Sequence, residues 1–426
     1  MTMKRILLLL IAFLPLFAYA QVDNVIDIVS ADRDKLAGCE GPYRFDAPAL
    51  TPAPKGYVPF YISHYGRHGS RYAWDAKTYT YVKQVLDAAA KAHVLTDLGK
   101  QIREDFNDFY FIPWVNTGDL VELGWDQHTE IARIMASDFP EVFSNGGVVL
   151  ARATTAPRAI VSMNAFTVSL QKAAPKTTIV ASAFHTELTS TIPVSAPKAI
   201  RPVYSGEVNL PESSEKFFAR TVDADAIIDR LISDRSLFEE EGGKTNFVWQ
   251  LYRLWGGYHN YSDSDFLEDV FTPEAALALW EAENYDLYCE HAGERYQNLS
   301  LLEDILTRAN GAIDGSGTVA DLRFGHDTCF NALRPLLNVN GCGYEAEKAD
   351  DVKYWFQDYD TPMAANIQIV LYRPKKGSGD ILFKILLNGA EAALPQLEPV
   401  DGPYYLWDDF TAWADMLLAN HPIVAK

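Results

Sequence analysis

The sequence predicts an α/β fold with a largely parallel central sheet and a mostly helical segment inserted into the core. Short runs rich in β-branched and aromatic residues alternate with helical patterns on both sides of a long, mostly helical middle stretch. The chain has 426 residues, of which 48% are hydrophobic, enough for a large buried core. Its formal net charge of −20 argues against a nucleic-acid-binding surface, which needs a basic face.

The N-terminal residues 1–20 have the pattern of a secretory signal. Lys4 and Arg5 precede an apolar run over 6–17, and Ala18-Tyr19-Ala20 matches a small-x-small cleavage site. The run is shorter than the ~20 residues that a membrane-spanning helix needs, although an uncleaved anchor is the alternative. We expect export to the periplasm or the medium, no stable membrane association after cleavage, and a mature charge of −22, because the signal carries two positive charges and no negative ones.

The first part of the predicted core covers residues 21–186. An aromatic and β-branched run over 56–65 predicts a buried strand that ends in a glycine-containing loop. Such loops at the carboxyl ends of strands are where open α/β sheets bind their ligands. Further strands are expected at 148–152 and 178–184, and helices at 78–93, 97–109, 120–139 and 157–170.

The stretch 187–316 predicts a helical cap domain inserted into that core. Proline-rich and serine-rich connections over 192–211 lead into helical patterns. The expected cap helices cover 223–233, 244–254, 273–291 and 299–310. The core then resumes over 317–426, with strands expected at 320–325, 365–372 and 381–387.

The cysteines and sequons bear on export. Four cysteines in an exported chain allow three disulfide connectivities, of which we favour Cys329 with Cys342. Because no CxxC pattern occurs, a structural zinc site is not expected. Asn260-Tyr-Ser262 and Asn298-Leu-Ser300 match the glycosylation sequon, which matters only in a eukaryotic secretory pathway.

The densest chemical signal is the loop Gly66-Arg67-His68-Gly69-Ser70-Arg71-Tyr72. Two arginines and a histidine within five residues repel one another unless an anion lies between them. Guanidinium forks match the oxygens of a phosphate, and glycines let the backbone approach it closely. The loop therefore predicts a phosphate site in which His68 faces phosphorus, with an exposed basic turn as the alternative.

Two later segments can complete such a site. Arg152 and Arg158 flank Ala-Thr-Thr-Ala-Pro after an expected strand, so Arg158 can reach the same crevice from the first turn of the next helix. Surface ion pairs are the alternative for both arginines. His326 and Asp327 follow another expected strand, where His326 can add positive charge and Asp327 can supply a proton. The alternative is that Asp327 only caps the following helix.

In this order, Arg67-His68-Gly69-x-Arg71, Arg152-x-Thr-x-x-x-Arg158 and His326-Asp327 resemble the motifs of the histidine acid phosphatases, clade two of the histidine phosphatase superfamily. The resemblance spans nearly the whole mature chain and implies a phosphoglycerate-mutase-like α/β sandwich with an inserted cap. The first loop is most similar to that of multiple inositol polyphosphate phosphatases. The sequence departs from that group at Ala73, where proline is usual, and at His326-Asp327, which resembles phytases and general acid phosphatases.

The resemblance implies an exported phosphomonoesterase that works through a phosphohistidine, with inositol polyphosphates such as phytate as the favoured substrates. It implies that His68 attacks phosphorus, that Asp327 protonates the leaving alcohol, and that neither a metal nor another cofactor is needed. The implied phosphate ligands are Arg67, Arg71, Arg158 and His326. A broad-specificity acid phosphatase is the alternative, followed by a non-catalytic protein that binds phosphorylated ligands.

Overall fold

The computed structural model describes residues 21–238, 241–262 and 266–425, so the predicted secretion signal lies outside the described residues. Runs of β-branched and aromatic residues form an eight-stranded sheet, because their side chains pack well on both faces of a pleated surface. Its strands are β1 (Tyr57–Arg67), β2 (Gly147–Ala153), β3 (Thr177–Ser182), β5 (Thr318–Gly325), β6 (Asn366–Pro374), β7 (Leu382–Leu387), β8 (Ala390–Ala392) and β9 (Tyr405–Leu406).

The sheet has a parallel half and an antiparallel half. Strands β3, β2, β5 and β1 lie side by side and run parallel, as the sequence predicts, whereas β6, β7 and β8 continue the sheet antiparallel beyond β1 and β9 pairs with β7. Arg67 at the end of β1 lies opposite Gly325 of β5, and Ala153 of β2 lies opposite Phe324. The carboxyl ends of the three strands are therefore level, so the loops that follow them meet.

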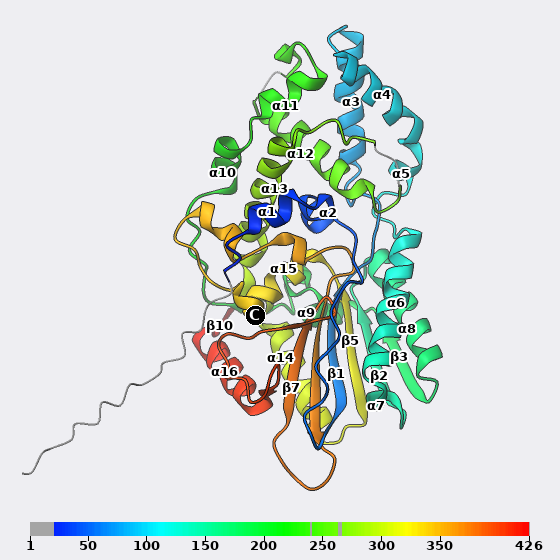
Figure 1. Cartoon of the computed structure of the whole chain (residues 1–426), viewed down its shortest axis with the longest axis vertical. Helices are drawn as coiled ribbons and strands as arrows, with labels where there is room; N and C mark the ends of the chain where they lie inside the picture. The colour runs from blue at the N-terminus through cyan, green and yellow to red at the C-terminus, as the bar shows by residue number, and fades with distance from the viewer. Residues whose placement is uncertain (1–20, 239–240, 263–265, 426) are drawn as a thin grey trace, which may run out of the picture.

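Helices cover both faces of the sheet (Figure 1). On one face α6 (Glu122–Asp138) and α8 (Pro157–Ala173) bury Ile131 and Phe166 against Leu322 of β5. On the other face the sheet packs against α14 (Leu299–Ile313), α15 (Asp327–Leu336) and α16 (Trp407–Asn420). The result is the predicted sandwich of helices around a sheet.

A helical layer lies over the carboxyl ends of the parallel strands, at the top of Figure 1. Its apolar cluster joins Leu86 to Phe247 and Leu251, so helices that precede residue 187 pack with helices that follow it. The layer consists of α3 (Lys77–Lys91), α4 (Asp97–Phe109), α10 (Ser214–Thr221), α11 (Ala224–Leu231), α12 (Glu241–Tyr258) and α13 (Pro273–Leu287).

The packing therefore departs from the predicted division into a core and a 187–316 cap. Helices α3 and α4, assigned to the core, belong to the helical layer, whereas α14, assigned to the cap, buries Leu302 and Ile305 in the same cluster as the strands. The amphipathic pattern of a helix indicates that one face is buried, but it does not identify the partner. Each of the two layers is built from several separate stretches of the sequence.

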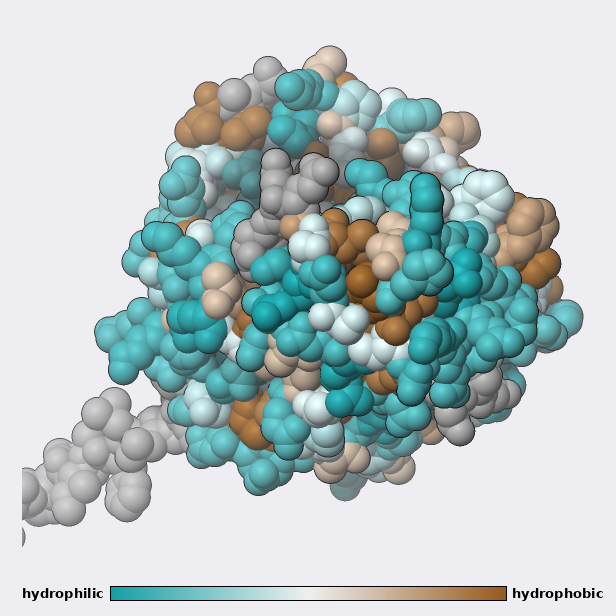
Figure 2. Space-filling view, turned by 90° about the horizontal axis from the view of Figure 1, so that it is seen from above, coloured by the Kyte–Doolittle hydropathy of each residue, from teal (hydrophilic) through white to brown (hydrophobic). Residues whose placement is uncertain are grey.

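Shorter elements connect these parts. They are α1 (Val25–Ser30), α2 (Arg33–Leu36), α5 (Phe111–Val115), α7 (Pro140–Phe143), α9 (Leu188–Thr191), the paired strands β4 (Val203–Tyr204) and β10 (Ile423–Ala425), the π-helical turn η5 (Tyr288–Ala292), and the 3₁₀ turns η1 (Gly38–Glu40), η2 (His185–Glu187), η3 (Pro193–Ser195), η4 (Arg235–Leu237), η6 (Arg295–Asn298), η7 (Val339–Gly341), η8 (Ala349–Tyr354) and η9 (Asp358–Asp360). Seen from above, the helical end is mostly hydrophilic with scattered apolar patches (Figure 2). Among the described residues, no helix is both long and apolar enough to cross a bilayer.

The favoured disulfide between Cys329 and Cys342 does not form, and all four cysteines are free. Cys329 is buried on α15, where its thiol donates to Asn298 Oδ1 at 3.3 Å. Both sequon asparagines are also buried, with exposed fractions of 1% for Asn260 and for Asn298. Their side chains therefore belong to the interior of the protein.

Candidate active site

The loop after β1 lies at the centre of the level strand ends, beneath the helical layer. Glycine is needed at position 69, because a Cβ there would lie 2.4 Å from the carbonyl oxygen of Gly124, near the start of α6. The same loop is braced by Gln127 of α6, whose Oε1 accepts a hydrogen bond from the amide of Ser70 at 2.9 Å. The close approach of two backbones thus holds the loop in place.

Arg67 and Arg71 leave this loop as buried side chains, each paired with a carboxylate. Arg67 is fully buried and donates through Nη2 to Asp327 Oδ2 at 2.8 Å, while Nη1 donates to the carbonyl oxygens of Cys39 and Thr361. Arg71 donates through Nη2 to Glu40 Oε1 at 3.1 Å. Both forks are held rigidly by these contacts.

Arg158 joins them from the first turn of α8, as the sequence predicts. Its Nη2 lies 3.4 Å from Nδ1 of His326, and no carboxylate among the described residues lies within salt-bridge distance of it. Burial, together with the nearby positive charge of Arg71, lowers the pKa of Arg158 to about 10. The site therefore contains a cation that needs a negative partner.

Unused hydrogen-bond donors indicate the same partner. The Nε atoms of Arg67, Arg71 and Arg158 are all buried without an acceptor among the described residues. Buried donors left unsatisfied are costly and uncommon in folded proteins. Three of them around one loop fit an anion with several acceptor oxygens, such as phosphate.

His68 lies between these arginines with a defined tautomer. Its Nδ1 is 2.9 Å from the carbonyl oxygen of Gly69, which can only accept, so Nδ1 carries the proton and Nε2 has a free lone pair. Burial and the positive charges of Arg158 and Arg67 lower the pKa of His68 well below its usual value. The imidazole is thus neutral and suited to attack an electrophile through Nε2.

His326 lies beside His68, with ring centroids 5.4 Å apart. Its Nδ1 accepts from Arg158, so its Nε2 donates to Thr154 Oγ1 at 2.9 Å. Burial, followed by the charge of Arg158, lowers the pKa of His326 to about 3. In the free protein the imidazole is therefore neutral and contributes hydrogen bonding, while its role as a phosphate ligand stays a prediction.

Asp327 uses both carboxylate oxygens in contacts that bear on the two roles left open by the sequence. One carboxylate oxygen accepts from Arg67 and faces the site, while Oδ1 accepts the backbone amide of Thr328 at 2.8 Å in the first turn of α15. Burial raises the pKa of Asp327, but Arg67 and Arg71 outweigh it and hold that pKa well below its usual range. The side chain is a carboxylate until further negative charge arrives.

Arg152, the other arginine of the second motif, does not reach the site. Its guanidinium donates to Asp304 Oδ2 at 2.7 Å and to Ser190 Oγ at 2.9 Å. Two site residues escaped the sequence analysis. Thr154 was visible only as the threonine of that motif, and Glu40 carried no signal, because it precedes β1 in a turn far from the loop in sequence.

One group of described residues has the donor atoms of a metal site. The Cys39 thiol and the carboxylates of Glu40 and Asp327 place one ligand atom each within 4.8 Å of one another. Burial raises the pKa of the Cys39 thiol well above its usual value, and both carboxylates already accept from guanidinium groups. Since a cation would have to displace Arg67 and Arg71, this group fits a metal poorly.

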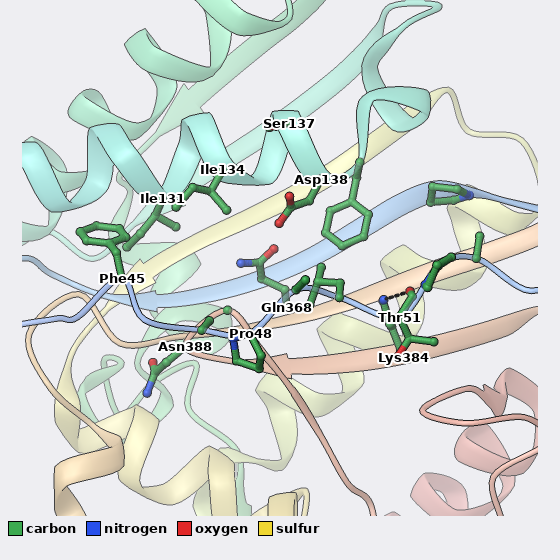
Figure 3. Close-up of a pocket in the computed structure, with 18 of the residues that line it drawn as sticks. Phe45, Pro48, Thr51, Ile131, Ile134, Ser137, Asp138, Gln368, Lys384 and Asn388 are labelled. Atoms are coloured by element: carbon green, nitrogen blue, oxygen red, sulfur yellow. Dashed lines mark hydrogen bonds between the residues drawn. The ribbon is translucent and has the colours of Figure 1, made fainter.

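A separate cavity of about 540 Å³ lies away from this site, between the 43–53 segment, α6 and the strands β6 and β7 (Figure 3). Its buried cation, Lys384, donates to the carbonyl oxygen of Thr51 at 3.0 Å and to Glu391 Oε1 at 2.7 Å. No residue of the predicted site lines this cavity. His68 and Arg158 lie instead at the carboxyl ends of the parallel strands.

Sequence comparison finds no matching family profile and no matching curated relative. Solved structures do match. The phosphate complex of the Bifidobacterium longum multiple inositol polyphosphate phosphatase is 16% identical, with a TM-score of 0.71 over 92% of this chain and 99% of that one. The phytase from D. castellii is 14% identical, with a TM-score of 0.65 over 91% and 86% of the two chains.

The chain thus has the fold of the histidine acid phosphatases and phytases. The phytase of Klebsiella sp. ASR1 shares this architecture more distantly, with 12% identity and a TM-score of 0.52 over 84% of this chain and 95% of that one. Within this class of fold, the chain covers nearly the whole length of the B. longum enzyme, which has also been crystallised with inositol hexasulfate.

Proposed function

We propose that this protein is an exported phosphomonoesterase of the histidine acid phosphatase type, which hydrolyses inositol polyphosphates such as phytate through a phosphohistidine. The observation that carries the proposal is the free Nε2 of a neutral His68 beside Arg67, Arg71 and Arg158, whose buried Nε donors lack acceptors among the described residues. A non-catalytic binding protein has no use for a nucleophile and a carboxyl group at the same site. The proposed site residues lie at the carboxyl end of β1 and in the loops and first helical turns that follow β1, β2 and β5.

In the proposed first step, Nε2 of His68 attacks phosphorus while the phosphate oxygens accept from Arg67, Arg71 and Arg158. The bond from phosphorus to the ester oxygen breaks, and the departing oxygen takes a proton from Asp327. In the second step, water attacks phosphorus, Asp327 takes its proton, and the bond to Nε2 breaks. Inorganic phosphate leaves and His68 returns to its starting state.

Asp327 must be protonated before it can act as the acid, although Arg67 and Arg71 hold its pKa well below the usual range. A bound phosphate monoester brings negative charge and competes for the same guanidinium donors. Both effects weaken the stabilisation of the carboxylate and favour its protonated form. The proposed function therefore couples substrate binding to proton uptake.

The substrate class rests on likeness in fold and motif. The B. longum enzyme is a multiple inositol polyphosphate phosphatase, and the structure from D. castellii is a phytase. The His326-Asp327 pair, which also resembles that of general acid phosphatases, keeps broad-specificity phosphatase activity as the alternative. Rates on phytate and on p-nitrophenyl phosphate, compared at equal enzyme concentration, separate the two.

The central experiment compares the wild type with His68→Ala. The wild type should release phosphate from phytate, and rapid quenching under conditions that preserve phosphohistidine should trap the labelled enzyme. His68→Ala should lose turnover and labelling while its unfolding curve stays close to that of the wild type. Substantial turnover by a folded His68→Ala protein would refute the assigned nucleophile.

Export is a separate part of the proposal and rests on residues 1–20. When the gene is expressed in a bacterium with a periplasm, the mature chain should begin at Gln21 and fractionate outside the cytoplasm. N-terminal sequencing of the fractionated protein checks both expectations. An intact N-terminus in the membrane fraction would favour the uncleaved anchor instead.

A further inference from the structure

We propose that Glu40 shares the leaving-group proton with Asp327 and is a positioning residue for phosphoryl transfer, an inference that rests on the proposed phosphatase function. Glu40 lies in the turn η1, before β1, and its role follows from where the fold puts its side chain. The two acids come from opposite ends of the chain. They meet at the phosphate-binding loop.

The contacts place the carboxylate of Glu40 inside the site. Its Oε1 accepts from Arg71 at 3.1 Å, and its side chain is only 14% exposed. One of its carboxylate oxygens lies within 4.8 Å of a carboxylate oxygen of Asp327. The carboxylates therefore form a close pair, with Arg71 on one side and Arg67 on the other.

The backbone of Glu40 is fixed to both layers of the protein. Its carbonyl oxygen accepts from Asn260 Nδ2 at 2.7 Å, and Asn260 Oδ1 accepts from Ser70 Oγ at 2.6 Å. Gly257, near the end of α12, lies beside the carboxylate, where a Cβ would make ordinary contact with Glu40 Oε2 at 3.6 Å. These contacts join Glu40 to the phosphate-binding loop through the helical layer.

Two carboxylates this close resist the simultaneous loss of both protons, and such a pair titrates as a unit. In the free protein, Arg67 and Arg71 offset the repulsion. A phosphate monoester that accepts from the same arginines removes part of that compensation, so the pair takes up one proton. That proton moves to the ester oxygen as its bond to phosphorus breaks and the bond from His68 Nε2 to phosphorus forms.

Charged and titratable groups face this pair from every element around it. Around the carboxylates lie Arg67, His68 and Arg71 of the loop, Arg158 of α8, His326 and Cys39 from the adjoining turns, His291 of η5, Arg253 of α12, Glu283 of α13 and Asp358 of η9. The arginines outnumber the other acids in this set, so positive charge predominates around the two carboxylates. Added anionic charge is what moves the pair toward protonation.

The test uses Glu40→Gln, which keeps an oxygen that can accept from Arg71 but cannot hold the proton. With glycerol 2-phosphate, a poor leaving group, kcat should fall at least about tenfold, less than the ~10²-fold to 10⁴-fold loss of a whole general acid because Asp327 remains. With p-nitrophenyl phosphate, whose leaving group needs little protonation, the fall should be less than about threefold. Glu130→Gln, which alters an exposed Glu–Arg pair on α6, is the matched control and should change neither rate.

Three further measurements separate proton sharing from a merely structural role. The double variant Glu40→Gln with Asp327→Asn should be little slower than Asp327→Asn alone, because both changes remove the same proton. In Glu40→Gln, the alkaline limb of the kcat/KM profile on glycerol 2-phosphate should move to lower pH. The variant lacks the negative charge that helps to keep Asp327 protonated, so Asp327 loses its proton at a lower pH. Glu40→Asp should recover part of the lost rate.

The outcomes are distinct. Equal losses on both substrates, additive effects in the double variant, or an unmoved alkaline limb would each overturn the sharing of the proton, and would leave Glu40 as a support for Arg71. If the wild type hydrolyses neither substrate, the proposed phosphatase function itself fails. If the wild type is active and Glu40→Gln slows both substrates equally, the present inference fails while the proposed phosphatase function stands.

Discussion

Two clusters of arginines lie close to the parallel strands, and they differ in how the arginines are paired with carboxylates. In one, Asp304 of α14 accepts from Arg152, Arg308 and Arg323 at 2.7, 2.9 and 2.9 Å. In the other, Arg67 and Arg71 each have one carboxylate partner, whereas Arg158 has none within salt-bridge distance among the described residues. Every arginine of the first cluster therefore has a carboxylate partner, whereas the second cluster contains one arginine without such a partner.

The difference teaches that an arginine motif does not identify a ligand site by itself. Arg152 and Arg158 are six positions apart in one motif, yet one belongs to each cluster. Their roles follow from the acids around them. The guanidinium of Arg152 donates to Asp304, while Arg158 has no carboxylate within salt-bridge distance among the described residues.

The largest effect on stability should come from breaking the cluster around Asp304. Asp304→Ala removes the carboxylate shared by three arginines, and loss of one partner from a buried ion pair typically costs about 3 to 5 kcal/mol. We expect the free energy of unfolding, measured by urea denaturation, to fall by about that amount. Turnover per folded molecule should be retained, and an unchanged unfolding midpoint would show that the cluster stabilises little.

The next effect concerns His64 and His128, which are buried together beneath the active-site loop with no hydrogen-bond partner among the described residues for any ring nitrogen. Burial is the main reason that the pKa of each falls from 6.5 to about 3. Between these values the unfolded chain binds more protons than the folded one, so stability rises with pH in this window. Their contribution is complete above about pH 6.5 and is lost as the pH falls toward 3.

This pH dependence can be measured by urea denaturation between pH 7 and pH 4. We expect His64→Phe to flatten the dependence, because an aromatic ring that cannot titrate replaces one of the two imidazoles. His93→Gln, on an exposed turn after α3, is the control and should leave the slope as in the wild type. A His64→Phe protein that lost stability as steeply on acidification would contradict the assignment.

A smaller effect, on ligand affinity, is expected from a change in the cluster that contains Arg158. Arg158→Ala should weaken the binding of inositol hexasulfate, a non-hydrolysable polyanion, by more than about tenfold, the scale of one lost charge-assisted contact. Its unfolding free energy should hardly fall, since the variant removes a buried charge that lacks a carboxylate partner. Isothermal titration calorimetry measures the first quantity and urea denaturation the second.

Arg152→Ala is the matched partner of that variant and should show the reverse pattern. It leaves Asp304 with two arginines, so the free energy of unfolding should decrease. The Kd for inositol hexasulfate should stay within about twofold of the wild-type value, which is well below the tenfold change that corresponds to 1.4 kcal/mol of binding free energy. If Arg152→Ala weakened binding more than Arg158→Ala, the division into two clusters would be wrong.

The smallest effect should come from surface acids. Asp350 is half-exposed and pairs with Arg220. Interactions between surface charges are largely screened beyond the Debye length, which is ~8 Å at physiological ionic strength. Asp350→Asn, like Asp351→Asn, should change the affinity for inositol hexasulfate by less than about twofold in 0.15 M salt. A gain comparable to the Arg158→Ala loss would mean that overall charge, rather than the pocket, controls binding.

The same comparison explains what the sequence could and could not predict. Local patterns predicted the loop after β1 and the helix that carries Arg158, because a buried strand, a glycine turn and an N-terminal proline are signals that neighbouring residues set. The pairing of Arg71 with Glu40 and of Arg152 with Asp304 depends on contacts across the fold, which no local pattern encodes. For the same reason α3 was assigned to the wrong layer.

The buried amide of Asn260 has a practical consequence for producing the protein. In a eukaryotic secretory host, a sugar chain would be attached to the same Nδ2 that donates to the carbonyl oxygen of Glu40. The carbohydrate cannot fit where only 1% of the residue is exposed, so a modified chain could not close its helical layer over the loop. Homogeneous, fully active material therefore calls for a bacterial host, in which this asparagine stays unmodified.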